Sequence, residues 1–258
     1  MNKKDNNKNW FLETFNQKGE LYEDYLGKFP IERTNKEVNF VIKSLNLKKG
    51  MNILDIPCGS GRHSIFLAKK EINVIGVDIS NFMISEAKKR LLKEEKNLSI
   101  IFKKGDLRTF KSNKKFDAVI NLGNSFGYFS DKENELVIKN IRKLIKKDGF
   151  FVLDISNTAG MLRNLKEKSK NQIKNKKFII EEESFFDALS MKKYLHWKIK
   201  EKGKKGKNLK AVLRLYTFPE VNKLLTDNKF KITKIFGSFS HAPYSLESPR
   251  LIIISRAI

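Results

Sequence analysis

The spacing of apolar residues predicts a chain in which strands and helices alternate. Val38, Val41, Ile42 and Leu45 follow the i, i+3, i+4, i+7 spacing of one helix face, which predicts a helix over residues 35–47. From residue 51, short apolar runs predict strands at 52–56, 73–78, 98–103, 116–121 and 149–155, with helices at 60–70, 81–95 and 131–146 between them. Because these strands are apolar throughout, the order predicts an α/β fold with a doubly wound, mostly parallel sheet.

The second half of the chain departs from this alternation. Three consecutive segments have the composition of antiparallel strands, at 177–187, 191–200 and 209–216, and a turn signal, Gly203 to Gly206, precedes the third. We interpret them as a small insert over the carboxyl edge of the sheet. A helix at 218–228, with Thr217 as its cap, and strands at 229–239 and 249–257 then return the chain to the sheet.

Composition indicates a soluble globular protein. Of the 258 residues, 40% are hydrophobic, which is enough for a sizeable core and argues against wholesale disorder. Apolar runs stay far below the roughly 18 residues needed to cross a bilayer, so we expect no membrane association. The single cysteine, Cys58, makes neither an internal disulfide nor a zinc cluster by itself, and no other metal cluster stands out. A cytoplasmic location fits these features best.

The charge is strongly positive and unevenly distributed. Lys and Arg number 53 against 29 Asp and Glu, a net charge of +24, but only nine of the basic residues are Arg. Residues 161–177 and 192–210 together contribute fourteen of these net charges. Two interpretations stay open: solvated loops and strand faces, or a basic rim over a site for an acidic substrate.

The most informative stretch is the turn after the first predicted strand. Gly59 and Gly61 form a Gly-x-Gly turn that opens a helix, so a ligand can approach the backbone closely. Asp78 ends the next strand nineteen residues after Gly59, where an acid binds a ribose diol. A dinucleotide site has a third glycine where this chain has Ser64. The pattern therefore predicts a nucleoside site and favours S-adenosylmethionine, which has no pyrophosphate, over NAD.

Three motifs together resemble the class I S-adenosylmethionine-dependent methyltransferases. Residues 55–63 (DIPCGSGRH) and 76–80 (GVDIS) are similar to the bacterial small-molecule branch of that family, and residues 122–129 (LGNSFGYF) resemble the motif after the fourth strand in glycine N-methyltransferase-like enzymes. The resemblance implies a Rossmann-like, seven-stranded sheet in the order three-two-one-four-five-seven-six. Its last strand is antiparallel, and a small β-rich lid is inserted.

The resemblance also implies the residues that bind the cofactor, S-adenosylmethionine. Gly59 and Gly61 would let its methionine part lie against the backbone, and Asp55 would orient the loop and the amino group. Asp78 would bind the ribose hydroxyls, although an acid at this position also caps the following helix.

Further cofactor contacts are implied on both sides of this loop. Asp106, followed by Leu107, would face the adenine amine, and Arg33 would hold the methionine carboxylate. Asn121 would lie near the donor. For Asp106 a plain turn residue, and for Arg33 a surface residue in a turn, stay open as alternatives.

Other residues are candidates for the acceptor side of the site. Asn124 and Tyr128 would orient the acceptor or its reacting amine. Arg214 and Tyr216, two positions apart and so on one face of a strand, would bind an acidic substrate group if that face looks into the cleft, and His196 in the lid is a third candidate. Residues 154–157 lack the arginine that holds a carboxylate in glycine N-methyltransferase, so glycine itself is not the expected acceptor.

The resulting hypothesis is methyl transfer from S-adenosylmethionine to a nitrogen or oxygen of a small-molecule acceptor by in-line displacement. In one domain, 1–258, it places an N-terminal helical cap (1–50), a cofactor-binding core (51–160), a β-rich substrate lid (161–216) and a C-terminal part completing the sheet (217–258). The main alternative is an RNA methyltransferase using the basic lid stretches, but residues 121–124 (NLGN) lack the motif of amino-adenine enzymes. A non-catalytic nucleoside-binding module or an NAD-dependent oxidoreductase is disfavoured. The sequence leaves monomer and homodimer equally open.

Overall fold

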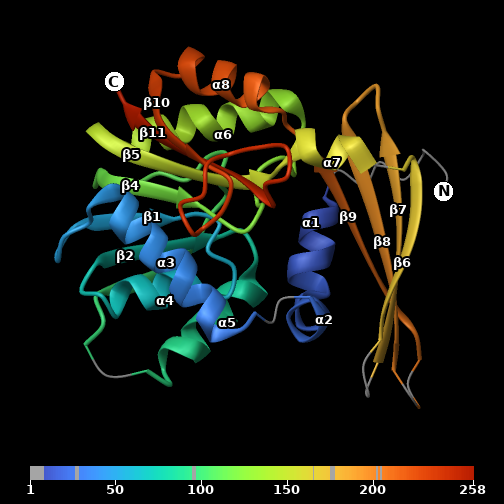
Figure 1. Ribbon diagram of the computed structural model, residues 1–258. Coiled ribbons are helices and arrows are strands. Elements are labelled where there is room, and N and C mark those ends of the chain that lie inside the picture. Colours follow the sequence, from blue (N-terminus) through green and yellow to red (C-terminus); the bar gives the residue numbers. More distant parts are fainter. Residues whose placement is uncertain are drawn as a thin grey trace.

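A seven-stranded sheet forms the centre of the computed structural model, which describes residues 9–26, 29–94, 97–164, 166–174, 178–201, 203 and 205–258 (Figure 1). Its strands are β1 (Asn52–Asp55), β2 (Asn73–Asp78), β3 (Ile100–Lys104), β4 (Phe116–Asn121), β5 (Ile145–Ser156), β10 (Phe230–Phe236) and β11 (Arg250–Ala257). Their order is β10-β11-β5-β4-β1-β2-β3, and β11 runs antiparallel to both of its neighbours. This confirms the expected strand order and the antiparallel last strand.

Helices cover both faces of this sheet. One face carries α3 (Ile31–Leu45), α4 (Arg62–Ala68) and α5 (Asn81–Leu91), and the other carries α6 (Asp131–Leu144) and α8 (Phe218–Asp227). In β1, Ile53 packs with the α3 side and Leu54 with the α6 side, and both are fully buried. Burial on both faces explains why the strands are apolar throughout. None of the described helices combines the length and apolarity needed to cross a membrane.

A second, antiparallel sheet stands beside the first one, after the short helix α7 (Thr158–Asn164). Its strands, in sheet order, are β6 (Lys168–Lys174), β7 (Phe178–Asp187), β8 (Lys192–Glu201) and β9 (Lys207–Arg214). β6 was not predicted, because its polar sequence has no apolar alternation; it forms by pairing along the edge of β7.

The N-terminal helices lie between the two sheets (Figure 1). They are α1 (Trp10–Leu12), a π-helical turn η1 (Glu13–Gln17) and α2 (Gly19–Tyr25). Leu21 of α2 packs on Ile180, Ile199 and Leu209 of the second sheet. We call residues 9–26 the N-terminal segment; its two flanks reach the pocket described next and the second sheet.

Candidate functional site

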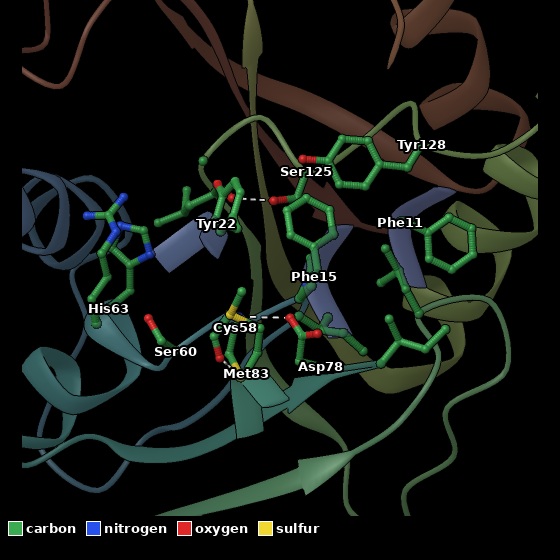
Figure 2. A pocket seen from close by; sticks show the side chains of 18 of the residues that line it. Phe11, Phe15, Tyr22, Cys58, Ser60, His63, Asp78, Met83, Ser125 and Tyr128 are labelled. Atoms are coloured by element: carbon green, nitrogen blue, oxygen red, sulfur yellow. Dashed lines mark hydrogen bonds between the residues drawn. The ribbon is translucent and has the colours of Figure 1, made fainter. Parts of the chain in front are cut away.

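A pocket opens at the carboxyl ends of β1, β2 and β4, between the glycine turn and the N-terminal segment (Figure 2). In open α/β sheets this edge is where ligands bind. Among the residues predicted to bind cofactor or acceptor, those lining the pocket are Arg33, Gly59, Asp78, Asp106, Leu107 and Tyr128. The predicted donor side of the site is therefore assembled around one cavity.

The glycine turn is held in shape by its own backbone. Gly61 caps α4 with φ of +80°, and a Cβ there would lie 2.6 Å from the ring of Phe102, so the position requires glycine. Gly59 lines the pocket and donates its N–H to Asp78 Oδ2 at 2.9 Å. At Gly59 the turn thus places backbone against the cavity.

Asp78 presents a buried carboxylate to the pocket. It is 6% exposed, and its two oxygens accept the backbone N–H groups of Gly59 and Ser80, each at 2.9 Å. Burial raises the pKa of Asp78 to about 6, although these two hydrogen bonds act in the opposite direction. A carboxylate oxygen has room for more than one hydrogen bond, so each oxygen of Asp78 is able to accept a further bond from a ligand hydroxyl.

Asp55 and Asn121 lie behind the turn rather than in the pocket. Asp55 is fully buried and accepts a 2.5 Å hydrogen bond from the hydroxyl of Ser64, and burial raises its pKa. Asn121, also fully buried, donates from Nδ2 to the carbonyl of Ile56 at 3.1 Å. Asp55 thus ties the end of β1 to α4, and Asn121 ties the end of β4 to the residue after β1, so both position the turn from behind the cavity.

Asp106 lines the pocket beside Leu107 but is already engaged by an arginine. Arg108 donates from Nη2 to Asp106 Oδ2 at 2.7 Å and also pairs with Glu133. Burial alone raises the pKa of Asp106, but the hydrogen bonds and charge of Arg108 outweigh it and hold the pKa below its usual range. The carboxylate is therefore ionised and fixed at the mouth of the cavity.

A buried acid, Glu37, joins three basic side chains that line the pocket. Its side chain is 4% exposed; Arg33 Nε donates to Oε1 at 2.9 Å, and His63 Nε2 lies 2.7 Å from Oε2. Arg62 also donates to Oε2, and to Thr34 at 3.1 Å. We call Arg33, Glu37, Arg62 and His63 the Glu37 cluster.

The Glu37 cluster carries a net positive charge. Burial raises the pKa of Glu37, but the hydrogen bonds and charges of His63 and Arg62 outweigh it, and the pKa ends well below its usual range. With Glu37 ionised, the two guanidinium groups of Arg33 and Arg62 face its one carboxylate. This end of the pocket therefore suits one further anionic group.

Aromatic rings line the opposite side of the pocket. The rings of Phe15 and Tyr128 are stacked with centroids 5.8 Å apart, and Phe15 also meets Tyr22 edge-on at 4.8 Å. Phe11 packs edge-on against Phe129 at 5.2 Å. Figure 2 shows Phe11, Phe15 and Tyr128 on one side of the cavity, and Ser60 and His63 on the other. The aromatic side chains of the N-terminal segment therefore form one wall of the pocket.

The N-terminal segment is fastened on both of its flanks. Ser80 Oγ donates to the carbonyl of Phe15 at 2.6 Å, and Arg90 pairs with Glu23 at 2.7 Å. On the other flank, Thr14 donates to the carbonyl of Lys210 at 2.6 Å. These contacts make the segment a fixed wall of the pocket.

His196 was predicted to bind substrate, but it lies outside the pocket. It sits on β8 between Leu195 and Trp197, which pack toward the N-terminal segment. Because side chains alternate along a strand, His196 points to the opposite face, where its Nδ1 lies 4.0 Å from Glu183. Its position corrects the expectation of a substrate contact.

Arg214 and Tyr216 also lie outside the pocket, although they share one face as predicted. The guanidinium of Arg214 stacks on the Tyr216 ring at 4.5 Å and pairs with Glu220 and with Asp131. Tyr216 donates to Asp131 at 2.8 Å. This network ties the end of β9 to α6 and α8, so the two side chains anchor the second sheet rather than reach a ligand.

Asn124 is turned away from the cavity as well. It has a φ of +64°, and its Oδ1 accepts the N–H of Ser156 at 2.8 Å. It thereby fixes the loop after β4 to the end of β5, whereas Tyr128 of the same loop lines the pocket. Of the two predicted orienting residues, only Tyr128 is positioned to contact an acceptor.

Sequence reasoning missed Glu37 and the role of Arg62. The predicted helix began at residue 35, which left Arg33 in a turn; α3 begins at Ile31, so Arg33 and Glu37 are one helical turn apart. An apolar helix face interrupted by Glu37 was the available signal, since a buried acid requires partners. Such an acid needs basic partners from elsewhere in the chain, and the adjacent Arg62 and His63 supply them.

Comparison with known proteins agrees with this arrangement. Residues 53–149 match the family described as methyltransferase domain. The glycine/sarcosine N-methyltransferase of Aphanothece halophytica is 32% identical over 126 residues, which cover 48% of this chain and 48% of that protein. The chain thus matches about half the length of this relative.

Solved structures extend the likeness to almost the whole chain. An S-adenosylmethionine-dependent methyltransferase from Clostridium acetobutylicum superposes with a TM-score of 0.80 at 19% identity, covering 95% of this chain and 99% of that one. An amino pentose methyltransferase from Micromonospora echinaspora, solved with SAM bound, gives 0.70 at 16% identity, covering 94% and 97%. At these identities the structures establish a shared fold.

Proposed function

We propose that the chain is a class I S-adenosylmethionine-dependent methyltransferase that transfers the methyl group to a nitrogen or oxygen of a small-molecule acceptor. The observation that carries this is one cavity with two unlike halves. The first half is lined by Asp78 and by the Glu37 cluster, in which two guanidinium groups face one carboxylate. The second half is lined by aromatic rings. A donor with a ribose and a carboxylate fits the first half, which leaves the ring-lined half for the acceptor.

The residues of the first half fit the donor group by group. Asp78 would accept hydrogen bonds from the ribose hydroxyls with its remaining lone pairs. Arg33 and Arg62 would bind the methionine carboxylate, and Gly59 would leave room for the methionine chain. Asp106, with Leu107 beside it, would receive the adenine amine.

Bound S-adenosylmethionine supplies an electrophilic methyl group on a sulfonium. The protein's task in an in-line displacement is then to align the acceptor and exclude water. The N-terminal segment closes the ring-lined half from one side, and Tyr128 approaches from the loop after β4. Burial raises the pKa of the Tyr128 hydroxyl, so it stays protonated and acts by orienting the acceptor.

Transfer of labelled methyl from S-adenosylmethionine into host extract tests this proposal. After separation into small-molecule, RNA and protein fractions, we expect the label in the small-molecule fraction and its loss with the Asp78→Ala variant. Label in RNA would instead assign the basic residues of the second sheet to nucleic-acid binding, and absence of label from every fraction would reject the proposal.

Cofactor affinity should depend on pH through Asp78. Because its pKa is about 6, the carboxylate that accepts the ribose hydroxyls becomes protonated as the pH falls through that value. We expect S-adenosylhomocysteine to bind about tenfold more weakly at pH 5 than at pH 7.5, because only protein with ionised Asp78 would bind it. Calorimetry across this range measures the effect. The Asp78→Asn variant, which has no titrating group there, should give a flat profile; an equally steep one would show that Asp78 does not carry the dependence.

A further inference from the structure

The two halves of the pocket differ in charge as well as in shape. The cations that line it among the described residues, Arg33 and Arg62, belong to the Glu37 cluster. Both guanidinium groups stack on Phe29, with distances of 4.4 and 4.8 Å to its ring centroid. They are thereby held at the donor end of the pocket.

Guanidinium groups near the ring-lined half are already neutralised by acids. Arg108 stacks on the outer ring, Phe129, at 4.3 Å, and its charge is matched by Asp106 and Glu133. Arg250, which starts β11, donates to Asp154 at 2.7 Å. Neither arginine lines the pocket, so in the described part of the chain the ring-lined half offers no cation to a carboxylate or phosphate.

Acidic groups, by contrast, do face this half. Glu23 lines the pocket next to Tyr22, and Asp78 lies below the rings. Burial first, and then the charge of Glu23, raise the pKa of Tyr22 to about 12; the charge of Arg62 acts in the opposite direction, and that of Asp78 adds to the rise. For Tyr128 the charge of Asp78 adds to burial in raising the pKa, and the charge of Arg250 opposes it. Since Glu23 is itself paired with Arg90, the described residues of this half present paired charges and ring faces rather than a free cation.

Resting on the proposed function, we propose that the acceptor is an amine on an uncharged, apolar or ring-bearing body, with no carboxylate or phosphate. The negative faces of the rings of Phe15, Tyr22 and Tyr128 attract a cationic nitrogen. The amine nitrogen, having lost its proton to water, forms the new N–C bond as the S–C bond breaks and sulfur keeps the electron pair. Positive charge grows on nitrogen during this step, where the rings stabilise it.

This inference replaces the expectation of an acidic acceptor. That expectation rested on the basic stretches 161–177 and 192–210 and on Arg214, whose guanidinium is paired with Glu220 and Asp131 outside the pocket. It also gives a physical reason why residues 154–157 lack an arginine: an acceptor without a carboxylate has no use for one.

Two matched ligand pairs test the inference by calorimetry on the full chain saturated with S-adenosylhomocysteine. Phenethylamine and phenylalanine differ only by the carboxylate, and we expect the amine to bind at least about tenfold more tightly. Choline and its uncharged isostere 3,3-dimethylbutan-1-ol differ only by the charge, and we expect choline to bind roughly fivefold more tightly.

Variants of the rings locate the effect. Phe15→Leu and, as a second position, Tyr128→Leu should each remove most of the preference for choline, whereas Phe66→Leu, outside the pocket, should leave it unchanged. Equal binding within the pairs, tighter binding of phenylalanine, or no binding of either amine would overturn the inference while S-adenosylhomocysteine still binds. Failure of S-adenosylhomocysteine to bind would overturn the proposed function, and the inference with it.

Discussion

Replacing Glu37 with alanine should lower the free energy of unfolding by about 3 kcal/mol, because it leaves the largely buried Arg62 and the buried His63 without their shared partner. Arg62 and His63 are 16% and 7% exposed and both bond to the same carboxylate oxygen. Arg33, freed from Oε1, would lose its fixed direction toward the pocket. We therefore also expect S-adenosylhomocysteine to bind at least about tenfold more weakly, a loss comparable to one charged hydrogen bond.

Urea unfolding and calorimetry measure these two effects. Glu32→Ala, on the exposed side of the same helix, is the matched control and should change stability by less than about 0.5 kcal/mol. Glu37→Gln keeps the shape of the side chain without its charge, and its free energy of unfolding should lie between those of the two alanine variants. The effect should also shrink in acid: because the pKa of Glu37 is lowered in the folded chain, its contribution is present above its ordinary pKa and is lost as the pH falls below it. A Glu37→Ala protein as stable as Glu32→Ala would show that the cluster does not organise this end of the pocket.

Replacing Asp78 with alanine should weaken S-adenosylhomocysteine binding roughly thirtyfold, or about 2 kcal/mol, as expected for loss of a charged hydrogen-bond acceptor. The fold should tolerate the change. A raised pKa means that Asp78 stabilises the folded chain only in acid, and this contribution is lost as the pH rises through about 6. At neutral pH, alanine therefore removes a buried charge that the fold accommodates at a cost.

Calorimetry at pH 7.5, with a melting curve for each protein, separates binding from folding. Glu86→Ala, a surface acid on α5 paired with Lys89, controls for a general change in net charge and should leave the affinity unaltered. Full affinity in a folded Asp78→Ala protein would remove Asp78 from the donor site, and loss of the fold would assign it a structural role instead.

Local sequence signals predicted the central sheet well because its strands are buried on both faces. A mostly apolar run such as 116–121 (FDAVIN) favours a buried strand, and β4 spans that same range. β6 could not be predicted, since its sequence, KSKNQIK, has no buried face; its pairing with β7 depends on a strand that follows it in the chain. Helix α3 starts earlier than its apolar spacing indicated because Pro30 sets its first turn.

The candidate site divides along the same line. Gly59 and Asp78 come to the pocket because they end parallel strands, whose carboxyl ends share one edge. Side chains alternate between the two faces of the second sheet, so the sequence leaves two possible faces for Arg214 and His196. Choosing between them requires knowing what packs on each face. The N-terminal segment supplies that information only in three dimensions, through contacts such as Leu21 with Leu209.

The N-terminal segment also has a consequence for the order of folding. It is made before the second sheet, yet Thr14 bonds to Lys210, 196 residues later, and Tyr25 bonds to Glu201, 176 residues later. Contacts of such long sequence separation close large loops and form late. The ring-lined half of the pocket is thus completed only after Lys210 has left the ribosome, so a nascent chain forms the Asp78 turn before it possesses an acceptor site.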